Sequence, residues 1–202
     1  MKFNEMLRIQ TQISKLGGVI SLSDFANLVG LSDSQKVKYK LNQFIKNKII
    51  KRFINGFYIN DSPNLEVLSQ KIYPNSYISL GNILAKNLVI GSIPEKTIYA
   101  VKLGRTKEFS NDQIRIKYFS ICKDFFLDFE IKNGIKYASP EKAFIDLFYY
   151  YQKGFKASFN IFSDINISLL NISKIEVLLE SYKNKKFKTF VLGVVGEYRN
   201  KI

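Results

Sequence analysis

The chain has 202 residues, room for one large domain or two small ones, and a net charge of +14 from 31 basic and 17 acidic residues. So positive a balance favours a polyanionic partner, either nucleic acid or an anionic membrane surface. With no histidine and a single cysteine, Cys122, the sequence excludes histidine-based catalysis, intramolecular disulfides and nearly all zinc sites. Chemistry that depends on carboxylates or magnesium is not excluded.

Targeting and cofactor signals are also missing from the sequence. No apolar run approaches the roughly eighteen residues of a membrane span, and the first residues carry charges instead of a secretory leader's apolar stretch. Neither a phosphate-binding loop nor a glycine-rich dinucleotide motif is found. These absences predict a cytoplasmic protein that is not an enzyme and holds no cofactor or metal.

Two amphipathic helices are predicted first. The first runs from Phe3 to Leu16 and ends at Gly17-Gly18. A short apolar run over 19–22 follows, long enough only for a small strand. Ser23 is expected to cap the second helix, which Gly30 stops.

A third helix is predicted up to about Asn47, with Ser32 or Asp33 as its cap. The apolar residues that share one of its faces are Val37, Leu41, Phe44 and Ile45. The polar residues of the opposite face are Gln35, Lys36, Tyr39, Asn42, Gln43 and Lys46. A short helix, a four-residue turn and a second amphipathic helix have the spacing of a helix-turn-helix.

A β-hairpin is predicted directly after the third helix, because two β-rich runs flank Asn55-Gly56, a turn pair that accepts positive φ. A hairpin in this position is the wing of a winged helix-turn-helix. Residues 1–60 hold 10 basic and 3 acidic residues, whereas 61–202 hold 21 and 14. Basic residues are therefore densest where the motif predicts binding to double-stranded DNA.

Recognition helices enter the major groove with their N-terminal half, where lysines reach phosphates and amide side chains pair with adenine. The predicted DNA contacts are Ser34, Gln35, Lys36, Lys38, Tyr39, Asn42 and Gln43 on the third helix, and Lys51 and Arg52 on the wing. Winged helices also serve as protein-interaction modules, and lysines often form a solvated helix face. Motif order and charge together favour DNA.

A second domain over 63–202 is predicted after the turn-forming run Asp61-Ser62-Pro63-Asn64. Its helices are expected over 65–72, from Ser76 or Ser79 to about Asn87, and over 140–152, 172–182 and 187–199. Its strands are expected over 97–103, 114–119, 125–131 and 135–138. The expected fold class is α+β, with a small mixed sheet flanked by helices.

Charged residues at the start of the helix from Pro140 invite a catalytic interpretation. Glu141 and Asp146 are five residues apart and do not share a helix face, whereas Lys142 and Asp146 are spaced to form an ion pair. We expect capping by Ser139 and a surface or half-buried ion pair, not catalysis. Cys122 has apolar neighbours and is predicted to be a buried structural thiol.

Basic residues also occur along the predicted sheet: Lys102, Arg105, Lys107, Arg115 and Lys117. Two interpretations stay open for them. They either meet nucleic acid or form the polar side of a half-exposed sheet.

Two stretches of the second domain resemble a known family. Residues 76–80, Ser-Tyr-Ile-Ser-Leu, and above all 137–147, Tyr-Ala-Ser-Pro-Glu-Lys-Ala-Phe-Ile-Asp-Leu, are similar to the AbiEi family. These are antitoxins of abortive-infection, type IV toxin–antitoxin systems used in phage defence. The family pairs an N-terminal winged helix with a C-terminal antitoxin domain, and the domain order here is similar over nearly the whole chain.

The resemblance implies a protein that binds repeats in its own promoter and represses its operon. It further implies neutralisation of a co-encoded, nucleotidyltransferase-like toxin, typically without a stable complex. The family's DNA-binding element falls on 34–43 and on Lys51 and Arg52. Two alternatives stay open: a winged-helix transcriptional regulator whose second domain senses a ligand, and an enzyme acting on nucleic acid that the winged helix targets.

Overall fold

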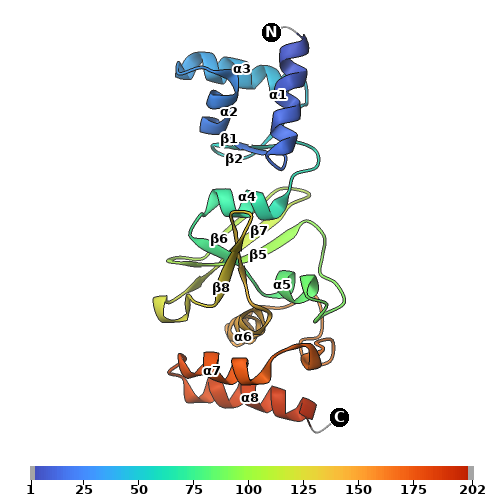
Figure 1. The fold of residues 1–202 in the computed structure, drawn as a ribbon, viewed down its shortest axis with the longest axis vertical. Helices are drawn as coiled ribbons and strands as arrows, with labels where there is room; N and C mark the ends of the chain where they lie inside the picture. Colours follow the sequence, from blue (N-terminus) through green and yellow to red (C-terminus); the bar gives the residue numbers. More distant parts are fainter. Residues whose placement is uncertain (1–2, 200–202) are drawn as a thin grey trace. The chain divides into compact units, whose positions relative to one another are not determined.

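The computed structural model describes residues 3–199, which divide into two units of an α+β fold (Figure 1). The first unit comprises the described residues up to Pro74 together with Phe109–Asp112. The second comprises Asn75–Glu108 and the described residues from Gln113 onward.

The first unit is a winged helix-turn-helix. Its elements are α1 (Phe3–Lys15), β1 (Val19–Ser21), α2 (Leu22–Val29), α3 (Ser34–Lys46), β2 (Lys51–Ile54), β3 (Phe57–Ile59) and α4 (Leu65–Ile72). The strands form an antiparallel sheet in the order β1-β3-β2. The first three helices bury one core, in which the Phe25 and Phe44 rings meet edge to face at 5.2 Å. The architecture predicted for the first sixty residues is confirmed.

The cap of α2 differs from the prediction, which named Ser23. Ser21 is the N-cap: the Asp24 amide donates to Ser21 Oγ at 3.0 Å, and the Ser21 amide donates to Asp24 Oδ2 at 2.9 Å. This reciprocal capping box satisfies two backbone amides, which a cap at Ser23 would not do. Of the two expected caps of α3, Ser32 and Asp33, the structure has Asp33, whose carboxylate accepts from the amides of Gln35 and Lys36.

The wing turn also differs in detail from the expected pair of positive φ angles. Gly56 has a φ of 83°, whereas Asn55 keeps a negative φ. The register of β2 against β3 shifts between Arg52 and Ile54, and this bulge reshapes the approach to the turn.

Helix α4 belongs to the first unit, which therefore extends past the boundary expected at 61–62. The Asn64 amide donates to the Gly17 carbonyl at 2.8 Å, and Lys71 Nζ lies 2.6 Å from Asp24 Oδ2. A Cβ atom on Gly17, whose φ is 76°, would lie 3.3 Å from the Asn64 Cβ. These contacts join α4 to the winged helix more closely than the turn-forming sequence before it suggests.

The chain after Pro74 builds a six-stranded sheet with helices. The elements are β4 (Ser76–Ile78), α5 (Gly81–Lys86), β5 (Thr97–Leu103), β6 (Lys107–Ser110), β7 (Arg115–Ile121), η1 (Lys123–Phe125), β8 (Phe129–Lys132), β9 (Ile135–Ala138), α6 (Pro140–Tyr151), η2 (Ile167–Leu169), α7 (Ile172–Glu180) and α8 (Lys185–Arg199). The strand order is β6-β7-β5-β4-β9-β8. Pairs β4–β9 and β5–β7 are parallel, whereas β4–β5 and β8–β9 are antiparallel, so the predicted mixed sheet is confirmed.

Three local predictions for this unit were wrong. Residues 76–78 form the inner strand β4, because they pair with both β5 and β9, so the helix does not begin at Ser76; it begins at Gly81, close to the alternative start at Ser79. Strand β8 begins at Phe129, since Lys123–Phe125 make a turn of 3-10 helix. Cys122 is exposed despite its apolar neighbours, because it lies just beyond β7, outside the sheet that would bury it.

Helix α6 lies between the sheet and the helices α7 and α8 (Figure 1). This position explains why the residues from Glu141 to Phe148 are all buried, charged ones included. Within residues 3–199, no helix is both long enough and apolar enough to cross a membrane.

The capping box yields a pH-dependent prediction. Burial opposes ionisation of Asp24, but hydrogen bonds from Lys71 and the Ser21 backbone lower the pKa of its carboxyl overall. An aspartate with a lowered folded-state pKa stabilises the fold above its unfolded pKa of about 3.9, and this contribution is lost as the pH falls through the lowered value. Asp24→Asn should therefore cost about 1 kcal/mol at pH 7, and the difference from wild type should shrink below pH 4.

Urea unfolding followed by circular dichroism at pH 7, 5 and 3 measures this difference. Asp61→Asn, an exchange at an exposed aspartate, is the matched control. A penalty for Asp24→Asn that stays constant down to pH 3 would contradict the assignment.

Candidate nucleic-acid interface

Helix α3 has one buried face and one face open to solvent. Val37, Leu41 and Phe44 are buried in the core of the first unit. Because an α-helix turns about 100° per residue, burying these three directs the opposite side of α3 outward. That outward side carries the polar residues predicted to contact DNA.

Seven of the nine predicted contacts lie on α3. Ser34, Gln35, Lys36, Lys38, Tyr39 and Asn42 are exposed, and Gln43 is half-buried. Tyr39 has 67% of its surface exposed. Four of the seven line one shallow hollow of about 500 Å³, whose lining residues are Leu31, Gln35, Lys36, Tyr39, Lys40 and Gln43.

The two predicted DNA contacts on the wing, Lys51 and Arg52, differ in their position relative to α3. Ser34 and Gly56 line a common hollow, so the start of α3 lies beside the wing turn. Arg52 is exposed, and its Nη2 donates to Asn55 Oδ1 at 2.9 Å, which holds the guanidinium near that turn. Lys51 is half-buried opposite Ile59, at the other end of the hairpin. The structure thus groups Arg52 with the start of α3 and separates Lys51 from it.

Two carboxylates modify this surface. Glu5 of α1 accepts from Lys40 Nζ at 2.9 Å, and this hydrogen bond lowers the pKa of Glu5. Lys40 is thereby partly neutralised. Asp33 occupies the first free amides of α3, so side chains, not the helix N-terminus, must supply contacts to an anion. Lys46 is an exposed outward residue that the helical spacing identified but that the predicted contacts omitted.

Of the five basic residues noted along the sheet, Lys102, Arg115 and Lys117 have partners within the protein, whereas Arg105 and Lys107 are exposed. Lys102 is buried, and its Nζ donates to the Leu103 carbonyl at 2.8 Å. Glu108 accepts from Arg115 at 2.7 Å and lies 3.7 Å from Lys117 Nζ, and the Arg115 hydrogen bond lowers the pKa of Glu108. For Lys102, Arg115 and Lys117 these contacts favour the polar side of a sheet, whereas both interpretations stay open for Arg105 and Lys107.

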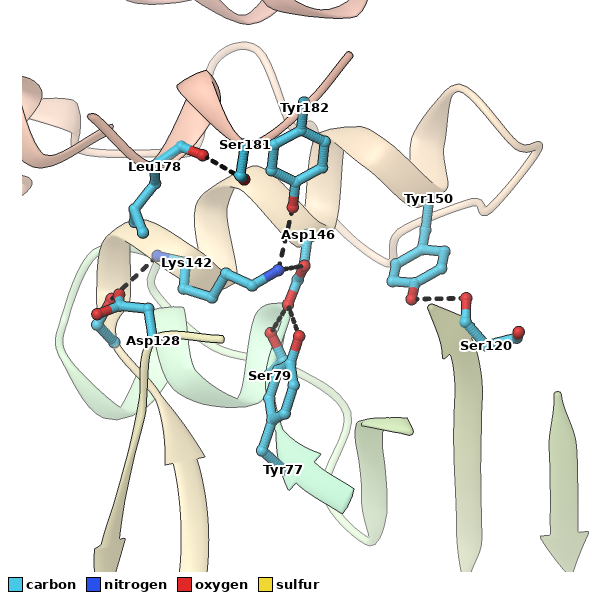
Figure 2. A network of polar contacts seen from close by, with 11 residues as sticks. Tyr77, Ser79, Ser120, Asp128, Lys142, Asp146, Tyr150, Leu178, Ser181 and Tyr182 are labelled. Atoms are coloured by element: carbon cyan, nitrogen blue, oxygen red, sulfur yellow. Dashed lines mark hydrogen bonds and ion pairs between the residues drawn. The ribbon is translucent and has the colours of Figure 1, made fainter. Parts of the chain in front are cut away.

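Lys142 and Asp146 form the expected ion pair, but far deeper than predicted (Figure 2). The two side chains are 1% and 0% exposed. Tyr77 and Ser79 donate to Asp146 Oδ2 at 3.0 and 2.7 Å, and Lys142 Nζ also donates to the Tyr182 hydroxyl at 3.1 Å. The network therefore joins α6 to the β4 region and to Tyr182, two residues past the end of α7.

Burial controls the ionisation of this network. It raises the pKa of Asp146 against the opposing attraction of Lys142, and it raises the pKa of Tyr77, which therefore remains a neutral donor. Neither charged group can reach a substrate in this position. The nearby Glu141 accepts from the Asn171 amide at 3.1 Å and lies 3.4 Å from Lys174 Nζ, so it links α6 to α7.

Ser139 is the predicted cap of α6, with the Lys142 amide donating to its Oγ at 3.1 Å. The Asp128 carboxylate accepts from that same hydroxyl. Among the described residues, no group of three or more cysteine, aspartate or glutamate side chains is placed to hold a metal ion.

No protein-family model matches the chain, and no curated protein matches its sequence. Among solved structures, the crystal structure of the RV2827C protein from Mycobacterium tuberculosis is similar, with a TM-score of 0.60. The match covers 95% of this chain and 77% of that chain at 9% sequence identity. At this identity the similarity shows the fold alone: the two proteins share an α+β arrangement over nearly the whole of this chain.

The buried pair yields a stability prediction. Lys142→Met leaves the Asp146 carboxylate buried without its counter-charge and should cost about 3–5 kcal/mol. The double variant Lys142→Met with Asp146→Leu removes both charges and should be more stable than Lys142→Met alone.

Urea unfolding of the wild type, both single variants and the double variant measures the coupling. Lys132→Met with Glu130→Leu, which removes an exposed ion pair, is the matched control. Additive effects of the two buried substitutions would refute the interpretation of these residues as a structural pair.

Proposed function

We propose that this protein binds double-stranded DNA through α3 and the wing, represses its own operon, and counteracts a co-encoded, nucleotidyltransferase-like toxin through its second unit. The observation that carries the DNA part is the exposed face of α3. It presents polar and basic side chains beside a wing turn. Lys40, at the edge of this face, is paired with Glu5, whereas Lys36 and Lys38 are exposed.

The charge distribution supports the same surface. Residues 1–60 carry 10 basic and 3 acidic residues, an excess that attracts the phosphate backbone at long range. Helix-turn-helix proteins place the second helix of the motif in the major groove. Here that helix is α3, and its outward residues are of the types that contact phosphates and base edges.

The antitoxin part of the proposal rests on the resemblance of residues 76–80 and 137–147 to the AbiEi family. In this chain those residues form β4 with the two residues before α5, and the end of β9 with most of α6, and many are buried. They therefore build the framework of the second unit. A surface that counteracts a toxin has to be sought on its exposed residues.

A ligand-sensing regulator is the second candidate function, favoured by one cavity of the second unit. The cavity measures about 300 Å³, and its charged lining residues are Lys117 and Lys153. Hydroxyls of Thr106 and Ser120 also line it. Such a lining favours a small anionic ligand. An adjacent nucleotidyltransferase-like gene would favour the antitoxin over this candidate.

The DNA surface is tested by the salt dependence of binding. The combined substitutions Lys36→Ala and Arg52→Ala should remove two phosphate contacts, which lowers the slope of log K against log salt by about 1.8. Fluorescence anisotropy with a labelled duplex from the region upstream of the gene measures the slope. Lys15→Ala, at the exposed end of α1, is the matched control and should leave the slope unchanged.

A slope that is unchanged in the double variant while the protein still binds DNA would contradict the assignment of these contacts. A slope that falls equally for Lys15→Ala would mean that binding responds only to net charge.

Protection from the toxin should be separable from repression. With both genes under inducible promoters, the full-length Lys36→Ala and Arg52→Ala variant should rescue growth as well as wild type, although it no longer represses its own promoter. Growth and a promoter–reporter fusion measure the two activities in parallel. Loss of protection at wild-type protein levels would mean that the first unit also takes part in neutralisation.

A further inference from the structure

The outward side of α3 divides into a central line and two flanks. We define the crest of α3 as Gln35, Tyr39, Asn42 and Lys46, which lie within about 50° of the direction opposite Val37, Leu41 and Phe44. Lys36 lies to one side of the crest and Lys38 to the other, each at about 70–90° from its centre. All six residues are exposed.

The flanks match the borders of a major groove. When a helix lies in the groove, its crest faces the base pairs and its flanks face the phosphates of the two strands. Lys36 and Lys38 extend to opposite sides and carry the charge that phosphates attract. Lys40 lies at a larger angle from the crest than Lys36. Its ion pair with Glu5 makes it a weaker ligand for DNA phosphates.

The chemistry of the crest favours one kind of base pair. Glutamine and asparagine pair in a bidentate manner with adenine N6 and N7, arginine is the commonest reader of guanine, and acidic side chains accept from cytosine N4. The crest holds two amides, and α3 contains neither an arginine nor an acidic residue. Lys46 can also reach guanine, but it lies in the last turn of α3, away from the N-terminal half that enters the groove.

We propose that Gln35 and Asn42 read adenines, so that the preferred half-site of this protein is A·T-rich, while Lys36 and Lys38 contact phosphates of opposite strands. This inference rests on the proposed function of α3 in DNA binding. Tyr39 lies between the two amides and presents a ring whose apolar edge fits a thymine methyl group. Sequence preference and salt dependence therefore reside in different side chains of one helix.

The test is selection from a pool of randomised duplexes with the full-length protein, followed by sequencing. The wild type should enrich A·T pairs in a short central window. Gln35→Met with Asn42→Leu, which keeps the approximate side-chain sizes, should reduce discrimination against G·C in that window by about five- to a hundredfold. Its salt slope should stay at the wild-type value.

Lys36→Met with Lys38→Met is the matched variant on the flanks. It should lower the salt slope by about 1.8 and leave the selected sequence unchanged. Gln35→Arg supplies a gain of function that unfolding cannot mimic: it should convert one enriched A·T position into G·C, because arginine reads guanine O6 and N7.

Each outcome decides the inference. Wild-type binding without base preference, enrichment of G·C pairs, or an A·T preference that survives loss of both amides would overturn it and leave the proposed DNA binding standing. Failure of the wild type to bind any duplex at low salt would overturn both.

Discussion

Helix α3 must bury Val37, Leu41 and Phe44 to complete the core of the first unit, and the orientation of its polar face depends on this packing. These three side chains fix the rotation of the helix about its own axis, with the edge-to-face contact of Phe25 and Phe44 at the centre. A helix that rotated by one position would expose Phe44 and bury a polar residue. The same apolar contacts that stabilise the fold therefore determine which polar residues face outward.

A second constraint operates in the other unit. Helix α6 lies between the sheet and α7–α8, so even its charged residues lose contact with water. Two buried charges are tolerated only when each has a counter-charge and further hydrogen bonds, which Tyr77, Ser79 and Tyr182 supply. The charged residues that attract a catalytic interpretation in the sequence are thus explained by the position of α6.

The sequence was most informative where local signals are strong. The apolar spacing of α3, a cap at Ser32 or Asp33 and the Asn55-Gly56 hairpin could all be predicted, because each depends on residues close together in the chain. For the same reason the outward residues of α3 could be named in advance. Whether those residues meet DNA stays a prediction, since a solvated helix face has the same pattern.

Other features could not be predicted from the sequence, because they depend on contacts between residues far apart in the chain. Residues 76–78 are too few to show the alternation of a strand, and only pairing with β5 and β9 makes them one. The burial of Lys142 and the exposure of Cys122 were misjudged for a related reason: neighbours in sequence do not reveal what packs above α6 or beyond β7. The extent of the first unit likewise depends on Gly17 and Asn64, which lie 47 residues apart.

Backbone hydrogen exchange of the full-length protein, with and without a duplex from the upstream region of its gene, tests most directly that α3 is the DNA-contacting surface. The account predicts slower exchange over 34–46 and around the wing turn at 52–57, with α7 and α8 unchanged. Protection confined to the second unit, with exchange across α3 unaltered at saturating DNA, would contradict it.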